Sequence, residues 1–170
     1  MSIYTDALDN LIRDSLLDLT KFVARTNWRG REREAVSLYA FGFLVPRCRP
    51  DGPLSDPTQI GIDVAVRQLP GTGRKTLVCK DLVLWPTAAG TCWDENGQAT
   101  RGPLAIIEWK ARTKDLSNYD ESWLLGFSAG RPDFLGYAVS LCPNGAQTTL
   151  AASQVRGRQL TRGWLRFPEG

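Results

Sequence analysis

The sequence contains no histidine. This absence excludes hydrolytic sites of the Ser-His-Asp and Cys-His types and the common metal sites that depend on imidazole ligands. It also excludes phosphodiester cleavage by a histidine base or nucleophile. Any hydrolytic chemistry in this chain must therefore use carboxylates, lysine and a metal ion held by oxygen ligands.

Cysteine is scarce, and its positions, Cys48, Cys79, Cys92 and Cys142, include no CxxC pair. This spacing indicates neither a zinc site nor a disulfide framework. We expect free thiols in a reducing compartment. Cys79 lies in an apolar run, and we expect it to be part of the core.

Long hydrophobic runs are also absent, since none approaches the roughly 18 residues that a membrane span needs. The first residues carry acids and lack the apolar segment of an export signal. We therefore expect a cytoplasmic protein with no membrane partner. The chain has 170 residues, of which 42% are hydrophobic and 23% charged, and this predicts a single globular domain, 1–170.

Lysine is rare, because the sequence has five lysines against 16 arginines. The net charge is only +3. The arginines cluster at 25–33 and 155–166, each time with a tryptophan. Both clusters suit a nucleic-acid backbone, because the planar guanidinium pairs with phosphate and stacks on bases. Taken alone, each cluster is explained equally well as an ordinary solvated surface.

The spacing of apolar residues, prolines and glycines predicts the order of helices and strands. The expected elements are a helix over 5–25, a helix over 31–45, strands at 60–69, 75–85 and 104–112, a helix over 118–132, a strand at 134–142 and edge strands within 147–167. The prolines of 46–57 predict an exposed loop. The expected fold class is α/β, with a mixed β-sheet flanked by helices in the order α-α-β-β-β-α-β plus edge strands.

The segment 71–76, GTGRKT, has the composition of a phosphate-binding loop but not its pattern. Arg74 separates Gly73 from Lys75, and a strand rather than a helix is expected to follow. We interpret 70–74 as the turn of a hairpin between the first two strands.

The stretch 104–112, LAIIEWKAR, puts Glu108 and Lys110 on one face of an expected core strand. The preceding strand carries Asp81 in an apolar run, where an acid is costly unless it is paired or binds a metal. If the two strands are neighbours, the two carboxylates lie roughly 5 Å apart. Such carboxylates repel each other unless a cation lies between them, and Mg²⁺ prefers oxygen ligands of this kind.

A purely structural interpretation competes with this one. Glu108 and Lys110 would then form a surface pair, and Asp81 would be neutralised across the sheet by Arg67 or Lys80.

A third acid is expected from the second helix. Glu34 falls on the stripe of Leu38, whereas Glu32 falls on the neighbouring stripe of Tyr39. We favour Glu34 as the inward-facing acid and keep Glu32 as its rival.

Glu34 on a helix, Asp81 in a strand and Glu108-Trp109-Lys110 at the end of the next strand resemble the PD-(D/E)XK nuclease superfamily. The common core of that superfamily is helix, three strands, helix and strand. Its motif name has a proline where this chain has Lys80, although many members lack that proline.

The resemblance covers roughly residues 30–142 and implies a restriction-endonuclease-like three-layer core. Residues 1–26 would then be an added N-terminal helix, and 146–167 would be C-terminal edge strands.

The resemblance also implies a metal site. Asp81 and Glu108 would bind Mg²⁺, with Mn²⁺ as a substitute, together with the backbone carbonyl of Trp109 and, directly or through water, Glu34. Lys110 would position and polarise the attacking water or steady the charge of the phosphorane. The implied activity is Mg²⁺-dependent hydrolysis of phosphodiester bonds, with a DNA endonuclease as the expected form and a homodimer as one way to cut both strands. The alternative is an inactive nuclease fold that serves as a nucleic-acid-binding or protein-interaction module.

Basic residues are expected to contact the nucleic acid. They are Arg31, Arg33, Arg112, Lys114, Arg158 and Arg162. Arg112 and Lys114 directly follow the motif strand and could reach flanking phosphates. The loop 87–102 could recognise substrate through Trp93 and Arg101, or it could be a disordered connection.

Overall fold

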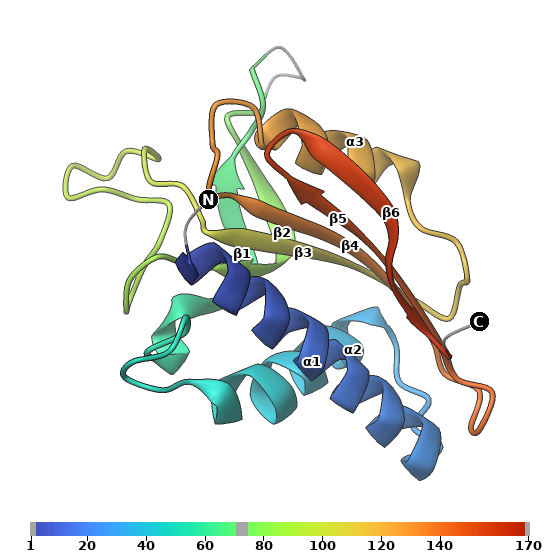
Figure 1. Ribbon diagram of the computed structural model, residues 1–170. Coiled ribbons are helices and arrows are strands. Elements are labelled where there is room, and N and C mark those ends of the chain that lie inside the picture. Colours follow the sequence, from blue (N-terminus) through green and yellow to red (C-terminus); the bar gives the residue numbers. More distant parts are fainter. Residues whose placement is uncertain (1–2, 71–74, 169–170) are drawn as a thin grey trace.

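The structure is a computed structural model that describes residues 3–70 and 75–168, and within these it forms a six-stranded mixed sheet between helices (Figure 1). The helices are α1 (Ile3–Thr26), α2 (Glu32–Tyr39) and α3 (Asn118–Phe127). The strands are β1 (Ile60–Arg67), β2 (Leu77–Leu84), β3 (Ala105–Ala111), β4 (Leu135–Cys142), β5 (Thr149–Arg156) and β6 (Gln159–Phe167). The α/β class, the mixed sheet and the predicted order of elements are confirmed.

The predicted ends of two helices are wrong. The regular part of α2 ends at Tyr39, and the chain continues as a π-helical turn over Ala40–Leu44 and a 3₁₀ turn over Val45–Arg47. Pro46 falls in the last of these turns and cannot donate a backbone hydrogen bond. Helix α3 stops at Phe127 and is followed by a turn over 128–130, in which Gly130 has a φ of +74°.

The strands follow one another across the sheet in the order β1-β2-β3-β4-β5-β6. Every neighbouring pair is antiparallel except β3 and β4, which are parallel and joined through α3. The carboxyl ends of β3 and β4 and the amino end of α3 therefore lie at the same side of the sheet. We call this side the site edge; Lys110 of β3 and Ser140 of β4 lie opposite each other there. The predicted hairpin turn at 70–74 and the glycine-rich segment fall largely outside the described residues.

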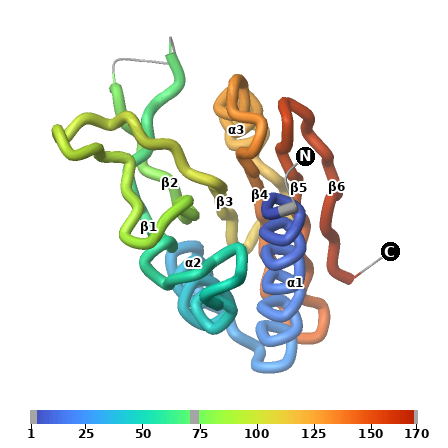
Figure 2. The backbone as a smooth tube through the Cα atoms, turned by 60° about the vertical axis from the view of Figure 1, so that its left-hand side comes forward, coloured from blue at the N-terminus to red at the C-terminus, as the bar shows by residue number. Residues whose placement is uncertain are grey.

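Two apolar layers hold the helices on the sheet. On one face, α2 packs over β2 and β3 while α1 packs over β4 and β6 (Figure 2). The buried Trp109 of β3 lies against Tyr39 of α2, with 5.2 Å between the ring centroids. Each fully buried side chain of this size contributes about 1.5–3 kcal/mol. This contact fixes α2 over the end of β3.

On the other face, α3 covers Ile106 and Val83 with Trp123 and Phe127, whose rings stack at 4.9 Å. Cys79 is exposed, so its predicted place in the core is wrong. Full burial in β2 begins only at Lys80, while Leu77 and Val78 are partly buried against the core on the α3 face.

Within residues 3–70 and 75–168, no helix is both long enough and apolar enough to cross a membrane.

Candidate active site

Lys110 is surrounded by carboxylates from several elements. Its Nζ lies 3.8 Å from Glu32 Oε2 at the start of α2 and 3.6 Å from Asp120 Oδ2 at the start of α3. It also donates a hydrogen bond of 2.7 Å to the backbone carbonyl of Trp109. Partial burial lowers the pKa of Lys110, but the charges of Asp120, Glu32, Asp81 and Glu108 outweigh it and raise the pKa above its ordinary value. Lys110 is therefore held as a cation.

Asp81 lies where β2 and β3 separate. The pairing of these strands runs only from Leu82↔Ile107 to Leu84↔Ala105. One residue beyond it, Asp81 Oδ2 accepts a hydrogen bond of 2.8 Å from the Trp109 backbone N–H. The carboxylate thus satisfies a donor that has lost its place in the ladder.

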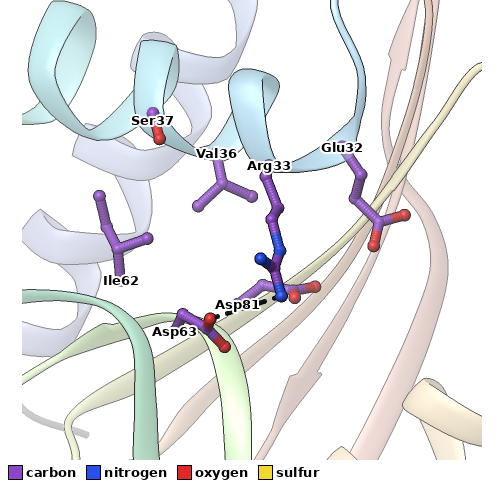
Figure 3. A pocket seen from close by; sticks show the side chains of 7 residues that line it. All are labelled: Glu32, Arg33, Val36, Ser37, Ile62, Asp63 and Asp81. Carbon is purple, nitrogen blue, oxygen red and sulfur yellow. Dashed lines mark ion pairs between the residues drawn. The ribbon is translucent and has the colours of Figure 1, made fainter.

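Asp81 opens into a cavity of about 270 Å³ beneath α2 (Figure 3). The lining side chains are Glu32, Arg33, Val36, Ser37, Ile62, Asp63 and Asp81. Arg33 forms an ion pair of 3.7 Å with Asp63 across the mouth of this cavity. Three acids from α2, β1 and β2 therefore share the cavity with one arginine.

Glu108 points to the other side of the sheet and is buried. It forms an ion pair with Lys80, and the ammonium of Lys80 also lies 3.6 Å from the centre of the Trp123 ring in α3. Burial raises the pKa of Glu108; Lys80 offsets only part of this, and Asp81 and Asp120 raise it further. The carboxylate remains close to Asp81, since its Oε2 lies 3.5 Å from the Asp81 backbone nitrogen.

The acids that the sequence predicts around one metal ion therefore do not all point to the same place. Asp81 opens toward α2 and Glu108 toward α3, while both lie within electrostatic reach of Lys110. Lys80 neutralises Glu108, and not Asp81 as the structural interpretation expected. Among the residues that the structure describes, no three Asp, Glu, Cys or His side chains are grouped so that they could hold a metal ion.

The preference for Glu34 over Glu32 is corrected by the structure. Glu34 is exposed, and its Oε2 accepts a hydrogen bond of 2.7 Å from the Arg31 backbone N–H at the start of α2. This is the role of a residue in the first helical turn, which satisfies a free backbone donor. The stripe of Glu34 also includes Phe41, which is 66% exposed, so this face of the helix points outward.

The predicted basic residues divide into two groups. Four of them are at or near the site edge: Arg31 and Arg33 at the start of α2, and Arg112 and Lys114 after β3. Arg158 lies at the other end of the sheet, in the turn after Arg156, which pairs with Leu135 at the start of β4. Arg162 donates two hydrogen bonds, of 3.1 and 3.0 Å, to the buried carboxylate of Glu121.

Arg158 and Arg162 therefore do not lie beside the motif strand β3. An arginine cluster in the sequence does not reveal which end of a hairpin it occupies, nor which buried acid it neutralises.

The loop 87–102 is an ordered connection. Cys92 is buried, and Asp94 accepts hydrogen bonds of 2.9 Å from the backbone N–H groups of Asn96 and Gln98. Trp93 is 43% exposed on this loop. In the described part of the chain, no hydrogen bond or ion pair joins Trp93 to Lys110 or to the acids around it.

The sequence did not lead us to predict that Lys80 pairs with Glu108 or that Asp120 lies beside Lys110. Lys80 offered a signal, because a lysine within an apolar strand needs a partner once it is buried. Asp120 follows the helix cap Ser117, whose hydroxyl accepts from the Asp120 backbone N–H, and acids are common in a first helical turn. Its closeness to Lys110 depends on the β3–α3 turn, which the sequence does not specify.

Comparison with known proteins adds no further support: no family profile, curated protein or solved structure matches this chain. The resemblance to PD-(D/E)XK nucleases therefore rests on the residues of the motif and on the order of the elements.

Proposed function

We propose that this protein is a metal-dependent nuclease that hydrolyses phosphodiester bonds of nucleic acid, and more specifically that it is a DNA endonuclease. The observation that carries this proposal is the position of Lys110 among four carboxylates, two of them at ion-pair distance and two within electrostatic reach. Glu32 comes from α2, Asp81 from β2, Glu108 from β3 and Asp120 from α3. A structural ion pair needs only one acid, so four acids around one lysine favour a functional cluster.

The architecture supports the same proposal. The sheet carries α2 on one face and α3 on the other, and the motif strand β3 is followed by a crossover to the parallel strand β4. This is the three-layer order expected of a restriction-endonuclease-like core. Asp81, Glu108 and Lys110 lie where β2 and β3 separate, which supports a site at this edge.

The donor chemistry fits Mg²⁺ in kind, because every candidate ligand is an oxygen atom. Asp81 and Glu108 would hold the ion with the Trp109 carbonyl, and Glu32 would take the place expected for Glu34. A bound Mg²⁺ supplies a water of lowered pKa and neutralises charge at the phosphate. Because Glu108 now pairs with Lys80, its carboxylate must turn toward Asp81 to join this set.

Lys110 has its own part in the reaction. Its ammonium lies beside the Trp109 carbonyl and is kept protonated by the acids around it. From there it can donate a hydrogen bond to the attacking water or to the phosphate oxygen that gains charge in the transition state. Removing one such donor typically costs about 10²–10³ in rate.

A second candidate function follows from the Lys80–Glu108 pair. Lys80 already supplies the positive charge that a metal would supply to Glu108. A nuclease fold with such an internal counter-ion would suit a binding or interaction module without turnover.

The test incubates the purified protein with supercoiled plasmid, linear duplex, single-stranded and branched DNA, and with RNA. Each substrate is tested with Mg²⁺, Mn²⁺ and chelator, and Asp81→Asn serves as the matched control. Cleavage that needs the metal and is lost in Asp81→Asn supports the nuclease. Binding without cleavage on every substrate would favour the interaction module instead.

A further inference from the structure

A second cavity, of about 330 Å³, lies at the site edge on the far side of β4 from Lys110. Its lining residues are Lys114, Ser140, Thr149, Leu150, Ala151, Arg166, Phe167 and Pro168. Two cations and no acid are among them. A neighbouring cavity of about 400 Å³ shares Lys114, Thr149 and Pro168, so the hollow continues beneath the β4–β5 turn. We call the two together the Lys114–Arg166 groove.

The strand register links this groove to Lys110. Lys110 lies opposite Ser140, Ser140 opposite Ala151, and Ala151 opposite Arg166. The row therefore crosses β3, β4, β5 and β6 in one straight line. With strands about 4.8 Å apart, the three steps separate the backbones of Lys110 and Arg166 by about 14 Å.

The row also lies on one face. Leu141 and Leu165, the neighbours of Ser140 and Arg166, belong to the core under α1 and α2. Because side chains alternate along a strand, Ser140 and Arg166 point to the opposite face, which carries α3. Ser153, two residues from Ala151, donates a hydrogen bond to Glu121 of α3 and confirms this direction.

The two cations of the groove are not paired with other side chains that the structure describes. Lys114 and Arg166 are exposed, and neither forms an ion pair or a side-chain hydrogen bond within residues 3–70 and 75–168. Arg162, the next arginine along β6, is instead engaged by the buried Glu121. The α2 cavity differs as well, since acids dominate its lining.

We propose that the Lys114–Arg166 groove binds the sugar-phosphate backbone of the nucleic-acid strand whose scissile phosphate lies at Lys110. This inference rests on the proposed nuclease function, which places the scissile phosphate at Lys110. A separation of about 14 Å corresponds to about four nucleotides at the rise of about 3.4 Å that a strand has along the axis of duplex DNA. Thr149 supplies a hydroxyl for a phosphate or sugar oxygen. The strand would thus cross β4 and β5 from Lys110 to the edge strand β6.

The test measures binding of a fluorescein-labelled 12-nucleotide single strand in chelator, over a series of salt concentrations. The variants are Lys114→Gln, Arg166→Gln and the double variant. The matched control is Arg158→Gln, which makes the same change of charge at the opposite end of the sheet. Thermal unfolding of each variant checks that the fold is kept, since all three positions are exposed.

Each lost phosphate contact on a single strand lowers the slope of log affinity against log salt by about 0.7. We therefore expect a decrease of about 0.7 in each single variant and about 1.4 in the double variant, with no change in Arg158→Gln. Equal slopes in the double variant and the wild type would overturn the proposal. So would displacement of the strand by polyglutamate as effectively as by unlabelled DNA, because the groove would then bind any polyanion, such as an acidic protein.

Cleavage assays of the same proteins in Mg²⁺ separate this proposal from the function on which it rests. If the wild type cleaves and the double variant binds and cleaves equally well, the groove is wrong and the nuclease stands. If the wild type binds no nucleic acid and cleaves none, both proposals fail together. Asp81→Asn should bind with an unchanged slope while it fails to cleave.

Discussion

Replacing Lys80 with methionine should destabilise the protein strongly. The side chains of Lys80 and Glu108 are only 3% and 7% exposed, so the substitution leaves a buried carboxylate without its counter-ion. Removing one partner of such a pair costs about 3–5 kcal/mol. Methionine keeps an apolar contact with the Trp123 ring, so loss of packing adds little. For a chain of this length, the loss corresponds to a decrease in Tm of roughly 6–20 °C.

The double variant Lys80→Met/Glu108→Met is the control, because it removes both charges and keeps an apolar filling. Replacing a whole buried pair in this way is often neutral or stabilising. We therefore expect the double variant to be more stable than Lys80→Met alone. Urea unfolding followed by the fluorescence of the six tryptophans measures both free energies.

The pH dependence gives a second check on the same pair. Burial already raises the pKa of Glu108, and without Lys80 the pKa rises further. A folded state with a raised carboxyl pKa binds more protons than the unfolded state, so its stability increases as pH falls through that range. The difference between Lys80→Met and the wild type should therefore be smaller at pH 5.5 than at pH 8. A loss below about 1 kcal/mol at pH 8, or one that does not shrink in acid, would refute the buried ion pair.

Three further variants test other parts of the cluster. Lys110→Met should keep DNA binding within a few-fold but slow single-turnover cleavage by about 10²–10³; a normal rate would give Lys110 a structural role. Glu32→Gln should impair cleavage, whereas Glu34→Gln should lower the free energy of unfolding by up to about 1 kcal/mol and leave cleavage intact; the reverse pattern would restore the prediction from the sequence. Arg162→Met should lower stability by about 2 kcal/mol, as it removes two hydrogen bonds from a buried carboxylate, while the salt slope of DNA binding stays the same; a lower slope would show that Arg162 contacts phosphate.

The order of helices and strands could be predicted because each signal is local. The periodicity of Leu8, Leu16 and Leu19 defines α1, and all three side chains are buried as expected. The apolar runs around Val83 and Ile106 define two strands. The end of α2 could not be predicted as well, because the chain passes through a π-helical turn before Pro46.

The directions of the site side chains could not be predicted from the alternation of side chains along a strand alone. The ladder between β2 and β3 stops at Leu82↔Ile107, so Asp81 turns toward α2 and Lys80 toward Trp123. The choice between Glu32 and Glu34 likewise depended on where the helix begins. A residue in the first turn can satisfy a free N–H instead of pointing to the core, and Glu34 does so.

The most direct test of the proposed nuclease activity is the single-turnover rate of DNA cleavage as a function of Mg²⁺ concentration, in the wild type and in Asp81→Asn. Asp81 forms no ion pair within the described residues, so this isosteric change removes a charge with little loss of fold. We expect a rate in the wild type that rises with Mg²⁺ to a plateau, and a rate in the variant that is at least about 10²-fold lower, on the order expected for a lost catalytic group. Equal rates in the two proteins, or cleavage that continues in chelator, would contradict it.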